Sequence, residues 1–122
     1  MFRSGDETVK TIRHLVVLCI LACPIAAFAG GSATGTVTGV LVDASFANVV
    51  YVTLSGAKAG NPPCSTSSRG QFVIPVTVVA DYAYMFSLVL SAQQTGATVT
   101  ITGQNQCNVD NNVETIQNIH IG

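Results

Sequence analysis

Few side chains that can transfer protons lie beyond Ala29. The acids there are Asp43, Asp81, Asp110 and Glu114, and the histidine is His120. A hydrolytic site needs a nucleophile, a base and a group that orients the base. A serine, His120 and an aspartate could supply these groups, but no serine lies in the glycine pattern of a nucleophile elbow. The scattered acids and the near-terminal histidine therefore predict a protein that is not an enzyme.

A metal site has one candidate segment. Asp110, Asn112 and Glu114 alternate along the chain, as the ligands do at the start of a calcium loop. The glycine that allows the sharp turn of such a loop is missing, and so is the distal bidentate glutamate. We therefore expect a polar hairpin loop here, with no metal and no cofactor.

The side chains present allow sugar binding but do not establish it. Tyr51, Tyr82 and Tyr84 could stack on pyranose rings, although the chain lacks tryptophan, the side chain best suited to stacking. For Tyr82 and Tyr84 a core or subunit-contact role is favoured. Threonines alternate in two segments, which are Thr34, Thr36 and Thr38, and then Thr98, Thr100 and Thr102. Such hydroxyl rows fit a sugar surface and an ordinary solvated strand face equally well.

Nucleic-acid binding is not expected. Charged residues make up 9% of the 122-residue chain, the formal net charge is −1, and hydrophobic residues make up 48%. The charged share of an average globular protein is roughly 25%. Beyond the N-terminal segment there is no cluster of Lys and Arg that could neutralise phosphates.

The N-terminal segment has the pattern of a secretory signal peptide. Lys10 and Arg13 precede an apolar run over residues 15–29, which ends in the small-x-small pattern Ala27-Phe28-Ala29. The run is shorter than the roughly 20 residues that a membrane-spanning helix needs. We expect residues 1–29 to be removed, residues 30–122 to form one domain without a membrane span, and the protein to be periplasmic or secreted.

Two cysteines remain in the predicted mature chain, Cys64 and Cys107. An even pair in an oxidising compartment predicts a disulfide. Chain entropy alone assigns such a loop, of over forty residues, about 4 kcal/mol of stabilisation.

The elements that must position these groups are mainly strands. Residues 30–35 are predicted to be a lead-in, an irregular segment of small residues before the first strand. That strand is expected over residues 36–42. Gly39 marks a bulge in this strand, because the apolar phase changes across it. Further strands are expected over residues 48–55, 71–79, 97–102 and 113–121. The loops are expected over residues 56–70 and 105–112, and Pro75 marks a strand edge or exit.

One segment has a helical period. Apolar residues from Tyr82 to Gln94 recur at i, i+3, i+4 and i+7, with Asp81 as N-cap and Gly96 as a left-handed stop. The stripe consists of Tyr82, Met85, Phe86, Val89, Leu90 and Ala92.

The expected fold is mainly β with one helix, a five-stranded Greek-key barrel of the oligonucleotide/oligosaccharide-binding (OB) type. Its helix falls between the third and fourth strands. The alternative is a plain antiparallel sheet with one packed helix.

The mature chain resembles a family of small exported bacterial proteins similar to the binding subunit of subtilase-type AB5 cytotoxin. The resemblance is carried by Thr38-Gly39-Val40, Val50-Tyr51-Val52, Leu54-Ser55-Gly56, Pro63-Cys64-Ser65 and Leu90-Ser91-Ala92-Gln93-Gln94-Thr95-Gly96. It continues through Val99-Thr100-Ile101-Thr102-Gly103, Cys107, Val113-Glu114-Thr115-Ile116 and Ile119-His120-Ile121.

The resemblance implies an OB-type barrel that assembles as a homo-pentamer, binds glycans and partners a toxin A-subunit-like protein. The glycan-contacting serine of the toxin subunit falls on Thr38, which keeps a hydroxyl. The pocket glutamine falls near Lys58 and the pocket tyrosine near Gly103. We therefore expect a non-enzymatic binding module with Thr38 and Lys58 at its glycan site. The alternative is a monomeric periplasmic structural or accessory protein.

Overall fold

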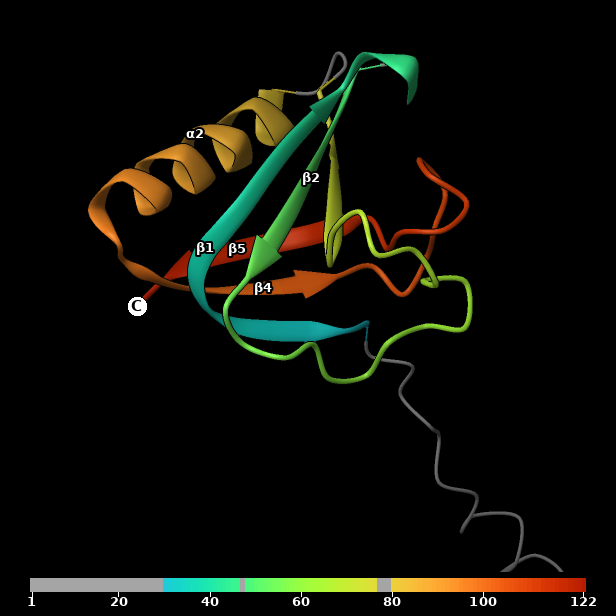
Figure 1. Ribbon diagram of the computed structural model, residues 1–122, viewed down its shortest axis with the longest axis horizontal. Helices are drawn as coiled ribbons and strands as arrows, with labels where there is room; N and C mark the ends of the chain where they lie inside the picture. Colours follow the sequence, from blue (N-terminus) through green and yellow to red (C-terminus); the bar gives the residue numbers. More distant parts are fainter. Residues whose placement is uncertain (1–29, 47, 77–79) are drawn as a thin grey trace, which may run out of the picture.

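The computed structural model of the protein describes residues 30–46, 48–76 and 80–122 (Figure 1). The predicted signal peptide lies outside these residues. In chain order the elements are β1 (Ser32–Asp43), the short 3-10 helix η1 (Ala44–Phe46), β2 (Val49–Leu54), β3 (Phe72–Pro75), α2 (Ala80–Thr95), β4 (Thr98–Gly103) and β5 (Ile116–Ile121). The predicted mainly β domain with one helix is confirmed for the described part of the chain.

The strands form one antiparallel sheet in the order β3-β2-β1-β4-β5. The long central strand β1 serves both halves of it. Its first half pairs with β4, from Ser32↔Thr102 to Thr36↔Thr98, and its second half pairs with β2, from Val37↔Leu54 to Asp43↔Val49. The lead-in predicted over residues 30–35 is therefore wrong from Ser32 onward. Pairing with β4 holds these small residues in a strand that their own propensities do not predict.

The predicted bulge at Gly39 is confirmed. The β1–β2 register shifts between Val37, which pairs with Leu54, and Gly39, which pairs with Thr53. Thr38 is therefore the extra residue of the bulge, and the bend lets one strand serve both halves of the sheet, as the curve of β1 in Figure 1 shows.

A second bulge lies between β4 and β5. Gly103 pairs with Ile116 and Thr102 with Asn118, so Gln117 is the extra residue. This shift turns both Ile116 and Ile119 toward the core, although they are three residues apart. The strand predicted over residues 113–121 is thus shorter, beginning at Ile116.

The helix α2 ends as predicted. Gly96 has φ 70°, and the Ala97 N–H donates to the Ala92 carbonyl oxygen at 3.2 Å, which forms a Schellman-type end. Two details of the predicted helix are wrong. Asp81 lies inside the first turn, because the helix begins at Ala80, and Leu90 of the predicted inward stripe is exposed. In the described part of the chain, no helix has both the length and the apolar character needed to cross a membrane.

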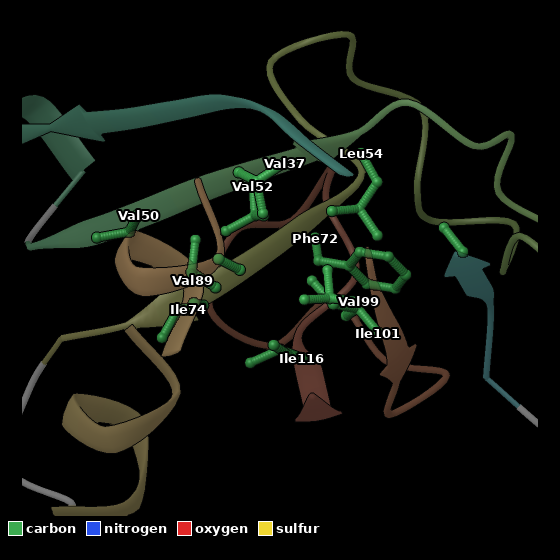
Figure 2. Close-up of a cluster of buried hydrophobic side chains, with 12 residues drawn as sticks. Val37, Val50, Val52, Leu54, Phe72, Ile74, Val89, Val99, Ile101 and Ile116 are labelled. Atoms are coloured by element: carbon green, nitrogen blue, oxygen red, sulfur yellow. The ribbon is translucent and has the colours of Figure 1, made fainter. Parts of the chain in front are cut away.

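The core lies between α2 and one face of the sheet (Figure 2). Alternate residues of β2 and β3 point into it, and Val89 and Ala92 of α2 cover it. The buried cluster consists of Ala33, Val37, Val50, Val52, Leu54, Phe72, Ile74, Val89, Ala92, Val99, Ile101 and Ile116. Val50, Val52 and Leu54 of β2 and Val99 and Ile101 of β4 alternate into this cluster.

The two outer strands approach one another at one end of the sheet. The Val73 N–H donates to the Glu114 carbonyl oxygen at 2.9 Å, and Val73 forms a parallel bridge with Thr115 just before β5. Residues 104–115 then cover the outer face of β2 and β3, where Val49, Tyr51, Val73 and Val113 form a second buried cluster. The sheet is therefore buried on both faces at this end.

The predicted disulfide is present. Cys64 and Cys107 are bonded, with their Cα atoms 6.1 Å apart and a separation of 43 positions in the chain. The bond joins the loop after β2 to the loop after β4. Figure 1 shows these two loops at the end of the molecule away from α2.

Candidate functional site

A buried ion pair joins the two loops. Lys58 lies in the loop after β2, Glu114 lies two residues before β5, and Lys58 Nζ is 2.6 Å from Glu114 Oε2. The side chains are 8% and 0% exposed. Charges so deeply buried are retained only where the remaining hydrogen-bonding capacity is also used.

The Glu114 carboxylate is fully engaged. It accepts from the Gly31 N–H at 2.9 Å on Oε1 and 3.2 Å on Oε2, and from the Asn105 N–H at 2.8 Å on Oε1. It also occupies the space beside Gly103, where an added Cβ would come within 2.2 Å of Glu114 Cδ. The tyrosine that the resemblance implies near Gly103 would therefore meet this carboxylate.

The Lys58 ammonium is also fully engaged. It donates to the Gln71 carbonyl oxygen at 2.9 Å and to Ser65 Oγ at 3.5 Å, and it lies 4.4 Å above the centre of the Phe72 ring. With Glu114 these acceptors match its three protons. A glycan contact at Lys58 would have to replace one of these internal partners.

The other predicted glycan residue, Thr38, lies elsewhere. It is exposed at the bulge of β1, and its hydroxyl donates to the Thr53 carbonyl oxygen at 3.2 Å. Its lone pairs remain able to accept a hydrogen bond. The two predicted glycan residues therefore lie on different segments, Thr38 in β1 and Lys58 in the loop after β2.

No motif in the sequence predicts the network around Glu114, but two features of the sequence are consistent with it. Glu114 is a lone acid within the apolar and β-branched run Val113-Glu114-Thr115-Ile116, and Lys58 is one of only two cations beyond residue 29. A lone charge in a strand-like apolar run indicates a buried group that needs a partner.

A second buried polar cluster lies on the outer face of β2. The Tyr51 hydroxyl donates to Asp110 Oδ2, Arg69 Nη1 lies 3.9 Å from the same oxygen, and Asp110 Oδ1 accepts from the Asn112 N–H at 2.8 Å. Burial raises the pKa of the Tyr51 phenol, and its hydrogen bond to Asp110 raises that pKa further. Because Tyr51 is only 1% exposed, its ring cannot stack on a sugar.

The segment considered for calcium forms a polar loop. Asp110 accepts a hydrogen bond from Tyr51, and Glu114 forms an ion pair with Lys58, so the two carboxylates face different partners. Within residues 30–46, 48–76 and 80–122, no group of three or more His, Cys, Asp or Glu side chains could hold a metal ion.

The threonine rows form one outer surface. Thr34 pairs with Thr100 and Thr36 with Thr98, and the Thr34 and Thr100 hydroxyl oxygens are 2.8 Å apart. His120 of β5 lies beside Thr100 in the same register and is exposed. The histidine therefore lies on this hydroxyl surface, on a different element from Asp110 and Glu114.

The outward face of α2 has fewer charges than is usual for a solvated helix. Tyr84 is 69% exposed and Leu88, one turn later, is 40% exposed. Ser87 and Ser91 lie beside them, and Asp81 is the only charged residue of the helix. Exposed apolar residues that adjoin on a helix are typical of a contact surface.

Comparisons with known proteins returned no match. No family model, no curated protein and no solved structure is significantly similar to this chain.

Proposed function

We propose that this protein is an exported, non-enzymatic binding module, resembling the binding subunit of a subtilase-type AB5 cytotoxin. In this proposal it assembles with copies of itself, as a homo-pentamer, and carries a glycan or a toxin A-subunit-like protein. The observation that carries the proposal is the outward face of α2, where Tyr84 and Leu88 are exposed one turn apart and Asp81 is the one charged residue of the helix.

The strand arrangement supports an OB-type Greek-key barrel. A bent first strand pairs with both β2 and β4, and the order β3-β2-β1-β4-β5 leaves β3 and β5 at the two edges. The parallel bridge between Val73 and Thr115 brings these edges together, as closure of a barrel requires.

The helix supports self-association. Its inward face already buries Val89 and Ala92, so the exposed Tyr84 and Leu88 have no role in the core of one subunit. Aromatic residues are enriched where subunits meet, and charged residues are depleted there. Repetition of weak sites in a ring would also raise the avidity for a multivalent glycan surface.

The positions of the titratable groups support a binding role over catalysis. Glu114 and Asp110 each hold a structural partner in the interior, whereas His120 lies on the outer surface of the sheet. A general acid or base must lie within hydrogen-bond reach of a reacting group. These three side chains do not converge on one such position.

The native mass of the exported protein tests the assembly. We expect a discrete pentamer, and we expect Leu88→Glu to dissociate it because a carboxylate would be desolvated at the contact. The matched control is Gln94→Glu, which adds the same charge at another exposed position of α2. A monomer at all concentrations would overturn the assembly and favour the monomeric periplasmic accessory protein.

A glycan screen tests the ligand separately. We expect the assembled protein to be retained on immobilised glycans, and Thr38→Ala to weaken retention because it removes an exposed hydroxyl. Thr98→Ala, at an exposed position on β4, is the control for general surface changes. Retention unaffected by Thr38→Ala would place the glycan site elsewhere on the molecule.

A further inference from the structure

The backbone of Gly31 is held by the domain. The Gly31 N–H donates to the Glu114 carboxylate at 2.9 Å, and the Gly31 carbonyl oxygen accepts from the Gly103 N–H at 2.8 Å. Gly31 is buried, and Ser32 continues directly into the paired strand β1. The backbone of this segment is therefore anchored from Gly31 onward.

The space around Gly30 and Gly31 fits glycine alone. A Cβ at Gly30 would come within 2.0 Å of the Gly103 carbonyl oxygen and 2.7 Å of the Asn105 nitrogen. A Cβ at Gly31 would come within 2.4 Å of Lys58 Cε and 2.7 Å of Glu114 Oε2. We call this space, lined by Lys58, Gly103, Asn105 and Glu114, the glycine slot.

The glycine slot adjoins the predicted cleavage position. The small-x-small pattern ends at Ala29, so the predicted scissile bond joins Ala29 to Gly30. Proteases act on segments that are exposed and able to leave the folded domain. A docked Gly30-Gly31 pair cannot leave it without breaking the contacts with Glu114 and Gly103.

We propose that the glycine slot is a maturation lock: once Gly30 and Gly31 have docked in it, a leader peptidase can no longer cut the Ala29–Gly30 bond, so the cut has to come before docking. The cut consumes one water molecule. The amide C–N bond breaks, Ala29 becomes a carboxylate, and Gly30 becomes an amine that takes up a proton. Docking then protects the new N-terminus and completes the first pairing of β1. The inference rests on the proposed export and adds an order of events to it.

Cleavage rates test this order. The substrates are the full-length chain, folded with its disulfide formed, and a peptide of residues 15–36, which has the same scissile bond and no domain to dock into. Purified leader peptidase is added, and the new N-terminus is identified by mass spectrometry. We expect the peptide to be cut after Ala29 and the folded chain to be cut at least about tenfold more slowly, since cleavage then follows the undocked population.

The outcomes separate the two proposals. Equal rates for the peptide and the folded chain would overturn the lock while leaving export intact. Failure to cut the peptide after Ala29 would overturn the predicted signal peptide, and with it the export on which the lock depends.

Two variants of the folded chain probe the slot itself. Gly31→Ala places a methyl group against Lys58 and Glu114, and we expect it to restore cleavage toward the rate of the peptide. The control is Gly39→Ala, whose methyl group would meet Thr53 at an ordinary 3.5 Å, and we expect it to stay resistant. A folded Gly31→Ala chain as resistant as its parent would overturn the lock. If that variant does not fold, the cleavage rates of the parent chain and the peptide still test the lock.

Discussion

At the scale of single residues, the Lys58–Glu114 pair shows how a chain with few charges uses them. Both partners are buried, and the carboxylate also holds two backbone N–H groups from segments distant in sequence. Such a pair does not by itself make a protein more stable than an apolar substitute would. Its consequence is positional, because Gly31 and Asn105 are both fixed against one carboxylate.

Loss of the carboxylate charge is therefore expected to be costly. Glu114→Gln leaves the Lys58 ammonium buried without its counter-charge, and we expect the free energy of unfolding to fall by about 3–5 kcal/mol. Urea denaturation of the oxidised protein measures this. Asp81→Asn, on the exposed first turn of α2, is the control and should change stability by less than about 1 kcal/mol. Equal effects of the two substitutions would contradict a structural role for the pair.

The Tyr51 phenol links stability to alkaline pH. Its pKa is raised in the folded protein, by burial and by the hydrogen bond to Asp110. The protonated phenol is therefore favoured by folding, and its contribution is complete below the unfolded pKa of about 10 and is lost as pH rises through the folded value. We expect the free energy of unfolding, followed by urea denaturation, to fall above about pH 10.

The Tyr51→Phe variant isolates this contribution. We expect it to lose about 1–3 kcal/mol near neutral pH, because Asp110 is left buried without the hydroxyl donor. Above about pH 10 it should lose less further stability than the parent protein. An equally steep alkaline fall in the variant would assign the pH dependence to other groups.

At the scale of elements, the sequence predicts the type of each element and the positions of the glycine breaks better than it predicts where the strands begin and end. Gly39 and Gly96 were both identified as breaks, and each lies where the chain changes direction or conformation. The segment 32–35 was not identified as a strand, because small residues carry little apolar pattern. Its strand conformation depends on pairing with β4, which is more than sixty residues away.

The end of α2 allows a direct test of backbone strain. Gly96 has φ 70°, and a Cβ there would meet no atom within 4 Å. Gly96→Ala is therefore expected to cost about 1–2 kcal/mol through the left-handed conformation alone. Thermal unfolding measures the change. Gly122→Ala also enters open space, at a residue without positive φ, and should leave the melting temperature unchanged.

At the scale of the whole molecule, the disulfide and the buried ion pair connect the same two loops. Cys64 and Lys58 lie in the loop after β2, and Cys107 and Glu114 lie in the segment between β4 and β5. This end of the molecule has little regular structure, so these two links hold the segments over the outer face of β2 and β3.

Removal of the disulfide should therefore destabilise the whole domain. Replacing both cysteines by serine releases a loop closed over 43 residues, and chain entropy predicts a loss of about 4 kcal/mol. Urea denaturation of the variant against the oxidised parent measures it. The reduced parent is the control for the serine hydroxyls, and it should resemble the variant. A variant as stable as the oxidised parent would show that other contacts already order these loops.

The sequence by itself determined the class of the domain, because strand alternation, one helical period and the glycine breaks are local patterns. It also determined the disulfide, since only two cysteines remain beyond residue 29. The tertiary structure decided the rest, because each feature depends on residues far apart in the chain. These features are the pairing that extends β1, the partner of Glu114, the burial of Tyr51, and the internal acceptors of Lys58. The sequence shows that Glu114 is charged, but its partners Lys58, Gly31 and Asn105 come close to it only when distant segments pack together.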